Sequence, residues 1–152
     1  MTRAMLATAL VRAISLSTST IGRLPFSDIA ANSPLTATIR TAVTSGIIAS
    51  PSPTTFGPDD PVSRQEFAAS LARALHLSTT TPTKIHILDE AQIAKSARDA
   101  VASITAKRYL PIFPDQTSRP TVTITREQAA QALFLALKTG CGPGRSEKRD
   151  HK

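Results

Sequence analysis

Three arginines recur at nearly equal spacing in this chain, each directly after a small hydroxyl residue. The first two pairs lie 61 residues apart and the last two lie 62 residues apart. The pairs are Thr2-Arg3, Ser63-Arg64 and Thr125-Arg126. A guanidinium group can bind a carboxylate or a phosphate through two parallel hydrogen bonds, and the open amides at a helix start also favour an anion. The three pairs therefore predict sites for an acidic ligand.

Each pair opens a block in which an apolar residue stands at every fourth position. The three apolar sets are Leu6, Leu10 and Ile14; Phe67, Leu71 and Leu75; and Ala129, Leu133 and Leu137. This spacing follows one face of an α-helix, so we predict packed helices over residues 2–16, 63–77 and 125–137. A single block cannot bury its own apolar face, and the long period indicates a repeat architecture.

The hydroxyl residues are expected to cap these helices, because an N-cap side chain accepts a hydrogen bond from a first-turn amide. Glu66 and Gln128 stand three residues after their caps and can complete a capping box, whereas Met5 cannot. A cation in the first turn loses roughly 0.3 to 1 kcal/mol against the helix dipole. Local helix stability therefore does not account for the arginines, whereas ligand binding would.

A second feature keeps the same period upstream of two of the blocks. Phe26-Ser27-Asp28 corresponds to Ile87-Leu88-Asp89 at a distance of 61 residues. A short helix is predicted after each, the first capped by Ser33 and ended by Gly46. The apolar face of the second consists of Ile93, Ala97, Ala100, Val101 and Ile104. Each unit is then helix, loop, helix, which predicts an all-α fold.

The composition fits one small domain with a modest core. Aromatic residues make up only 4% of the 152 residues, so the core must consist of Ala, Leu, Ile and Val. The single cysteine, Cys141, excludes an intrachain disulfide, and the histidines show no metal-ligand spacing. We expect neither a metal nor a cofactor. The sequence shows no nucleophile motif, phosphate-binding glycine loop or paired carboxylates, so we expect no catalytic residue and no enzyme.

The two ends of the chain differ from the repeats. Residues 139–152 are polar and carry more bases than acids, which predicts a disordered basic tail. Residues 1–27 contain arginine, serine and threonine but no acid, as in a mitochondrial transit peptide. The repeat register explains the same residues better. No stretch is long enough to span a membrane, and we expect the chain to start inside a repeat, with an export signal upstream.

Together, these residues resemble S-layer homology repeats, which show a Phe-x-Asp opening, a short helix ending in Gly-Ile, a Phe-x-Pro loop and an Ile-Thr-Arg-Ala-Glu block before a longer helix. Residues 26–77 match best, through Phe26, Asp28, Gly46-Ile47, Phe56-Gly57-Pro58 and Val62-Ser63-Arg64-Gln65-Glu66. Residues 87–138 keep Asp89 and Ile124-Thr125-Arg126 but have Lys107-Arg108 for the Gly-Ile and Gln128 for the glutamate. Residues 1–16 show only the second half of a repeat.

The resemblance implies a pseudo-threefold assembly of repeats around a central three-helix bundle, with grooves between neighbouring repeats. In that family the grooves hold an anionic secondary cell wall polysaccharide of bacteria, commonly pyruvylated, and anchor a protein at the cell wall surface. By position, the implied binding residues are Arg3, Asp28, Ser63, Arg64, Glu66, Asp89, Thr125 and Arg126. The chain has no tryptophan, so the stacking on sugar that the family often uses is not expected. The helix from Thr2 should lack a covering partner and favour self-association.

The net charge of +7 keeps a second hypothesis open, a small basic helical protein that binds nucleic acid. Its bases are spread along the chain instead of being clustered on one recognition helix. We therefore expect no nucleic-acid partner, and a steep loss of DNA binding with salt would indicate otherwise. Non-covalent wall anchoring is the favoured function.

Overall fold

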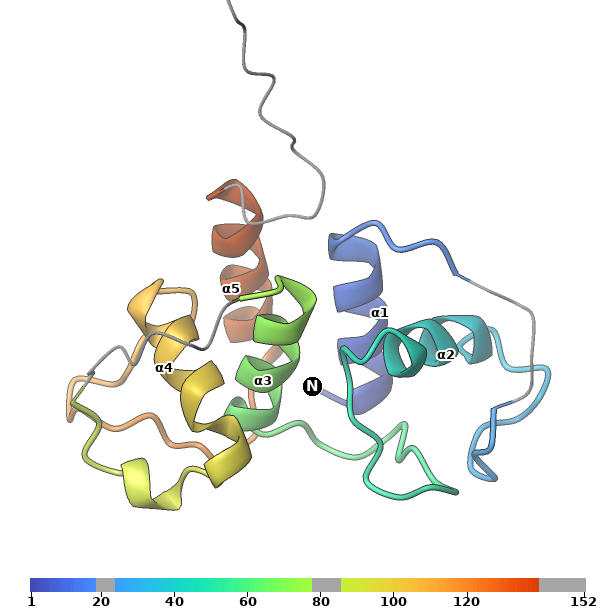
Figure 1. Cartoon of the computed structure of the whole chain (residues 1–152), viewed down its shortest axis with the longest axis horizontal. Helices are drawn as coiled ribbons and strands as arrows, with labels where there is room; N and C mark the ends of the chain where they lie inside the picture. Colours follow the sequence, from blue (N-terminus) through green and yellow to red (C-terminus); the bar gives the residue numbers. More distant parts are fainter. Residues whose placement is uncertain (19–23, 78–85, 140–152) are drawn as a thin grey trace, which may run out of the picture.

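The chain folds into helices joined by long loops (Figure 1). The computed structural model describes residues 1–18, 24–77 and 86–139. Its α-helices are α1 (Arg3–Ala13), α2 (Thr36–Thr44), α3 (Arg64–Ala74), α4 (Arg98–Ala106) and α5 (Arg126–Lys138), and 3-10 turns η1 (Glu90–Gln92) and η2 (Lys95–Ala97) precede α4. These ranges contain no strand, only two isolated antiparallel bridges. The all-α prediction is confirmed, whereas the predicted basic tail lies almost wholly outside the described residues.

The three long helices start where the hydroxyl residues predict. Thr2, Ser63 and Thr125 are the N-caps, and each side chain accepts a hydrogen bond from an amide three residues on. Glu66 and Gln128 complete capping boxes on α3 and α5. The structure shows no box on α1, as predicted, because a methionine side chain has no oxygen to reach back to the cap.

The short helices differ in part from the prediction. Ser33 does not cap α2, which starts at Thr36; its hydroxyl instead accepts a hydrogen bond from the Leu35 amide at 3.2 Å, within a separate turn. After α2, Gly46 takes a left-handed conformation with φ of +69°. Arg108 takes the same conformation after α4, with φ of +58°. The predicted register, which put Lys107 at the glycine position, is therefore wrong by one residue: Arg108 takes the place of Gly46, and a residue with a side chain is strained in this region of backbone space.

The long and short helices pack in pairs that cross the predicted repeat limits. α1 packs mainly against α2, and α3 packs mainly against α4, with a smaller contact between α1 and α3. In Figure 1 the first pair forms one side of the molecule and the second pair the other. The prediction that the helix from Thr2 lacks a covering partner is therefore wrong, because α2 covers it.

The starts of the three blocks meet in a closed ring of backbone hydrogen bonds. The Val62 amide donates to the Met1 carbonyl at 3.0 Å, and the Ile124 amide donates to the Val62 carbonyl at 2.9 Å. The amino group of Met1 closes the ring on the Ile124 carbonyl at 3.1 Å. Residues that share a repeat position thus lie together in space. A full pseudo-threefold arrangement around a central bundle stays a prediction.

The core is mainly aliphatic and alanine-rich, as the composition predicts, but the expectation that Ala, Leu, Ile and Val alone build it is wrong, because Phe56 and Phe67 are fully buried. Its largest fully buried side chains include Phe56, Phe67, Leu6, Leu10, Ile39, Leu71 and Ile104. The apolar sets of α1 and α3 are buried throughout, whereas on α5 only Ala129 is buried and Leu137 is exposed. Within the described ranges, no helix combines the length and the apolar character that crossing a bilayer requires.

Candidate functional site

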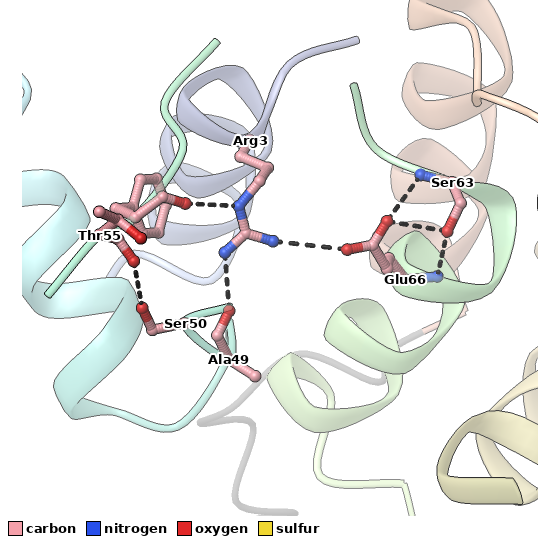
Figure 2. A network of polar contacts seen from close by, with 7 residues as sticks. Arg3, Ala49, Ser50, Thr55, Ser63 and Glu66 are labelled. Atoms are coloured by element: carbon pink, nitrogen blue, oxygen red, sulfur yellow. Dashed lines mark hydrogen bonds and ion pairs between the residues drawn. The ribbon is translucent and has the colours of Figure 1, made fainter. Parts of the chain in front are cut away.

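Arg3 is buried and points into the loop that follows α2. Its Nε donates to the Phe56 carbonyl at 2.8 Å, and a terminal nitrogen donates to the Ala49 carbonyl at 2.7 Å. The guanidinium also lies over the Phe56 ring, 4.8 Å from its centroid. Figure 2 shows Arg3 between Ala49 and the carboxylate of Glu66, which lies 3.5 Å away. The side chain thus joins the loop to the start of α3.

Arg64 repeats this arrangement in the next unit. Its Nε donates to the Ser118 carbonyl at 2.8 Å, and a terminal nitrogen donates to the Pro111 carbonyl at 3.0 Å. Phe113 supplies the ring, with its centroid 4.7 Å from the guanidinium carbon. Burial is the main cause that lowers the pKa of Arg64, and the nearby Arg119 lowers it further. The group nevertheless stays charged at any pH that the protein meets.

Asp28 and Asp89 hold the same loops from the other side. Asp28 accepts hydrogen bonds from the amides of Phe56 and Gly57, the latter at 2.7 Å. Asp89 accepts from the amides of Ser118 and Arg119, both at 2.8 Å. Each loop is thus clamped between an aspartate, which accepts hydrogen bonds from its amides, and an arginine, which donates a hydrogen bond to one of its carbonyls. Arg3 and Asp28 thus bind the backbone of one loop, and Arg64 and Asp89 bind the backbone of the other.

The backbone of each clamped loop turns through a left-handed residue. Gly57 has φ of +68°, and Arg119 has φ of +48° in the corresponding place. A Cβ at Gly57 would also collide with the carboxylate of Asp60. The Arg119 side chain lies over Phe113, 3.9 Å from the ring centroid, and pairs with Asp115 at 3.0 Å. Hydrogen bonds from the Thr117 hydroxyl and then from Arg119 lower the pKa of Asp115 to about 2.

The remaining predicted residues lie at the helix starts. Ser63 and Glu66 bond each other within the capping box, with the serine hydroxyl 2.8 Å from the carboxylate (Figure 2). Thr125 caps α5 in the same way. Arg126 differs from the other two arginines, because it is exposed and makes no hydrogen bond or ion pair with a described residue.

A groove of about 540 Å³ opens between the two better-preserved units. The end of α2, the outer face of α3 and the start of α4 form its walls. Its polar lining consists of Ser45, Arg73, His76, Ser96 and Asp99, beside the backbone of Gly46. Hydroxyls, a guanidinium, an imidazole and a carboxylate in one open groove can form hydrogen bonds with a polar, hydroxylated ligand.

Arg73 is the main cation of this groove. Its Nε donates to the Ala69 carbonyl at 3.1 Å, which aligns the side chain along its own helix. The side chain of Arg73 is exposed, so an anion in the groove can reach its guanidinium, although partial burial lowers the pKa of Arg73. The sequence analysis missed Arg73, although Arg12 stands at the corresponding position of the first block. A repeated arginine in the last helical turn was the available signal.

No group of His, Cys, Asp or Glu side chains suited to a metal ion occurs in the part of the chain that the structure describes. The polar residues of the groove come from separate helices and carry charges of both signs. Such groups can bind a ligand reversibly through hydrogen bonds and ion pairs.

Comparison with known proteins gives one family. The model of the S-layer homology domain matches residues 25–68, which span the clamped loop, α2 and the start of α3. No curated protein matches the chain. S-layer homology domains are non-enzymatic modules that anchor proteins to the cell wall at the cell surface. The sequence resemblance is confirmed over residues 25–68, which match the S-layer homology domain.

Proposed function

We propose that this chain is a wall-anchoring module that binds an anionic secondary cell wall polysaccharide, of the pyruvylated kind that the family commonly recognises. The observation that carries the proposal is the polar groove between the units, with the cationic side chain of Arg73 in it. The groove lies beside the segment that matches the S-layer homology domain and includes Gly46 from it. A sugar polymer offers hydroxyls for the serines and an acidic substituent for the guanidinium.

Four of the residues predicted from the sequence enter this proposal in a positioning role. Arg3 and Arg64 donate, and Asp28 and Asp89 accept, most of their hydrogen bonds to or from loop backbone, so we assign these four residues the positioning of the groove walls. Arg3 does this most directly, because its bond to the Ala49 carbonyl fixes the chain that continues from Gly46. Direct contact with the acidic group falls to Arg73.

The experiment that tests this function is calorimetric titration of the full chain with purified secondary wall polysaccharide. Arg73→Ala should weaken binding by about ten- to a hundredfold, because a hydrogen bond to a charged group contributes roughly 1.5 to 3 kcal/mol. The matched control is Arg12→Ala, an equal loss of charge at the corresponding position of α1. Equal affinities of the two variants would contradict a site at Arg73.

A further inference from the structure

The end of α3 brings a second ionisable side chain into the groove. His76 follows the C-cap residue of this helix, is exposed, and lines the groove together with Arg73. The His76 amide donates to the Arg73 carbonyl at 3.1 Å, and its backbone is left-handed, with φ of +49°. The imidazole itself has no hydrogen bond to a described residue. It can therefore donate to a ligand in the groove.

The end of α1 has the same backbone without the imidazole. Ser15 stands at the corresponding place, with φ of +54°, and its amide donates to the Arg12 carbonyl at 3.1 Å. The amide of the next residue bonds the preceding turn in both helices, at 3.0 Å each. Serine thus ends the helix in the same way as histidine does. The helix end does not require His76, and what the histidine adds is a side chain in the groove.

The fixed charges of the groove cancel. Its lining holds one permanent cation, Arg73 from α3, and one carboxylate, Asp99 from α4. The end of α2 and the turn η2 contribute no charged side chain to it. Among these described lining residues, His76 is the one whose charge changes between pH 5 and 8. Its protonation gives a neutral groove one net positive charge.

This change of charge bears directly on an acidic ligand. With a neutral imidazole, Arg73 attracts the anion while Asp99 repels it. An imidazolium adds a charged donor, and hydrogen bonds of this kind are roughly twice as strong as those between neutral groups. The dipole of α3 also favours a cation at its carboxyl end. Protonation of His76 and binding of the anion therefore favour each other, and by linkage the effect is reciprocal.

We propose that His76 is a second contact for the acidic ligand in this groove, and that its protonation makes binding tighter at mildly acidic pH than at neutral pH. The protonated imidazole donates to the carboxylate that Arg73 binds. A carboxylate substituent on a sugar stays ionised over this range, so the pH dependence arises in the protein. The inference rests on the proposed function, because it takes the acidic wall polysaccharide as the ligand of the groove.

The test is calorimetric titration of the full chain with purified secondary wall polysaccharide at about pH 5.5 and about pH 8, on either side of the histidine range. At each pH, two buffers with different ionisation enthalpies give the number of protons taken up on binding. The parent should bind about tenfold more tightly at the lower pH, as one added charge-assisted hydrogen bond predicts. Proton uptake should accompany binding within the histidine range.

Three variants separate a ligand contact from a structural role. His76→Ser gives α3 the residue that ends α1, and it should remove both the pH dependence and the proton uptake while keeping the weaker binding. His76→Arg should bind tightly at both pH values, and Arg108 and Arg119 show that arginine adopts this backbone. His86→Ser, at an exposed histidine that does not line the groove, should behave as the parent does.

The outcomes distinguish this inference from the proposed function. A parent that binds equally well at both pH values would overturn the inference and leave the proposed function standing. A pH dependence that persists in His76→Ser would do the same. If the polysaccharide bound the parent at neither pH, the proposed function itself would fall, and the inference with it.

Discussion

At the scale of single residues, two of the three first-turn arginines, Arg3 and Arg64, stabilise the fold. The helix dipole disfavours each by roughly 0.3 to 1 kcal/mol, but a hydrogen bond from a charged donor contributes roughly 1.5 to 3 kcal/mol. Arg3 and Arg64 each make two such bonds to loop carbonyls. The unfavourable position is therefore offset by contacts with residues far along the chain.

Arg64→Ala is expected to lower the free energy of unfolding by about 2 to 5 kcal/mol, because the Ser118 and Pro111 carbonyls lose their donors in a buried place. The free energy of unfolding of Arg64→Lys should fall between those of the parent and of Arg64→Ala, since lysine keeps the charge but lacks the planar fork. Urea unfolding followed by circular dichroism measures both values.

The matched control for Arg64 is Arg126→Ala, which removes the arginine at the same repeat position. Because Arg126 is exposed and bonds no described residue, its loss should change the free energy of unfolding by less than about 0.5 kcal/mol. Equal effects at the two positions would contradict the assignment of Arg64 to the loop.

Asp28 predicts a pH dependence of stability. Burial alone would raise its pKa, but hydrogen bonds from Gly57 and Phe56 and the charge of Arg3 lower it below the ordinary 3.8. In this pH range the native state therefore binds fewer protons than the unfolded state. The contribution of Asp28 to the free energy of unfolding is complete above its ordinary pKa and is lost as the pH falls through its pKa in the native state.

Urea unfolding at a series of pH values below 5 tests this dependence. Asp28→Asn should lose less stability on acidification than the parent, because its side chain does not titrate. Asp59→Asn is the control, since Asp59 is exposed and accepts no hydrogen bond from a described residue. If both variants follow the parent's pH profile, Asp28 is not the source.

At the scale of helices, the three starts were predictable because capping is a local interaction within four residues. The burial of Arg3 and Arg64 was not, because the carbonyls they bond lie 46 to 54 residues further along the chain. The start of α2 was missed because Ser33 serves a neighbouring turn. The groove at Arg73 could not be predicted from the sequence either, because residues of three separate helices form it.

Leu71→Ala tests the packing of α3 on its neighbours. Leu71 is fully buried, so its truncation should cost about 2 to 5 kcal/mol in the free energy of unfolding. The same change at Leu137, which is 44% exposed on α5, should cost less than about 1 kcal/mol. Thermal and urea melts of the two variants give the comparison, and equal costs would contradict the packing described for α3 and α5.

Arg108 provides a test of the helix ends. Its left-handed backbone suits glycine, which stands at the corresponding place after α2. Arg108→Gly should therefore raise the free energy of unfolding by about 0.5 to 1 kcal/mol. As a control, Arg12→Gly lies within a helix and should lower it by about 1 kcal/mol. A destabilising effect at position 108 would show that its side chain matters more than its backbone.

At the scale of the whole molecule, the groove depends on two sets of contacts, the ring of backbone hydrogen bonds and the clamps on the loops. The ring brings the three block starts together, and the clamps hold each loop on its long helix. The groove lies where the first packed pair meets the second, between α2 and the pair of α3 and α4. A stable loop framework is thus the condition for a groove of defined shape, which is what a wall-anchoring module needs.

The most direct test of wall anchoring is co-sedimentation of the full chain with purified bacterial walls, before and after removal of the secondary polysaccharide. The account predicts that the parent sediments with intact walls, that removal of the polysaccharide abolishes this, and that Arg73→Ala lowers it while Arg12→Ala does not. Sedimentation that survives removal of the polysaccharide would contradict the account and would point to peptidoglycan or to non-specific charge.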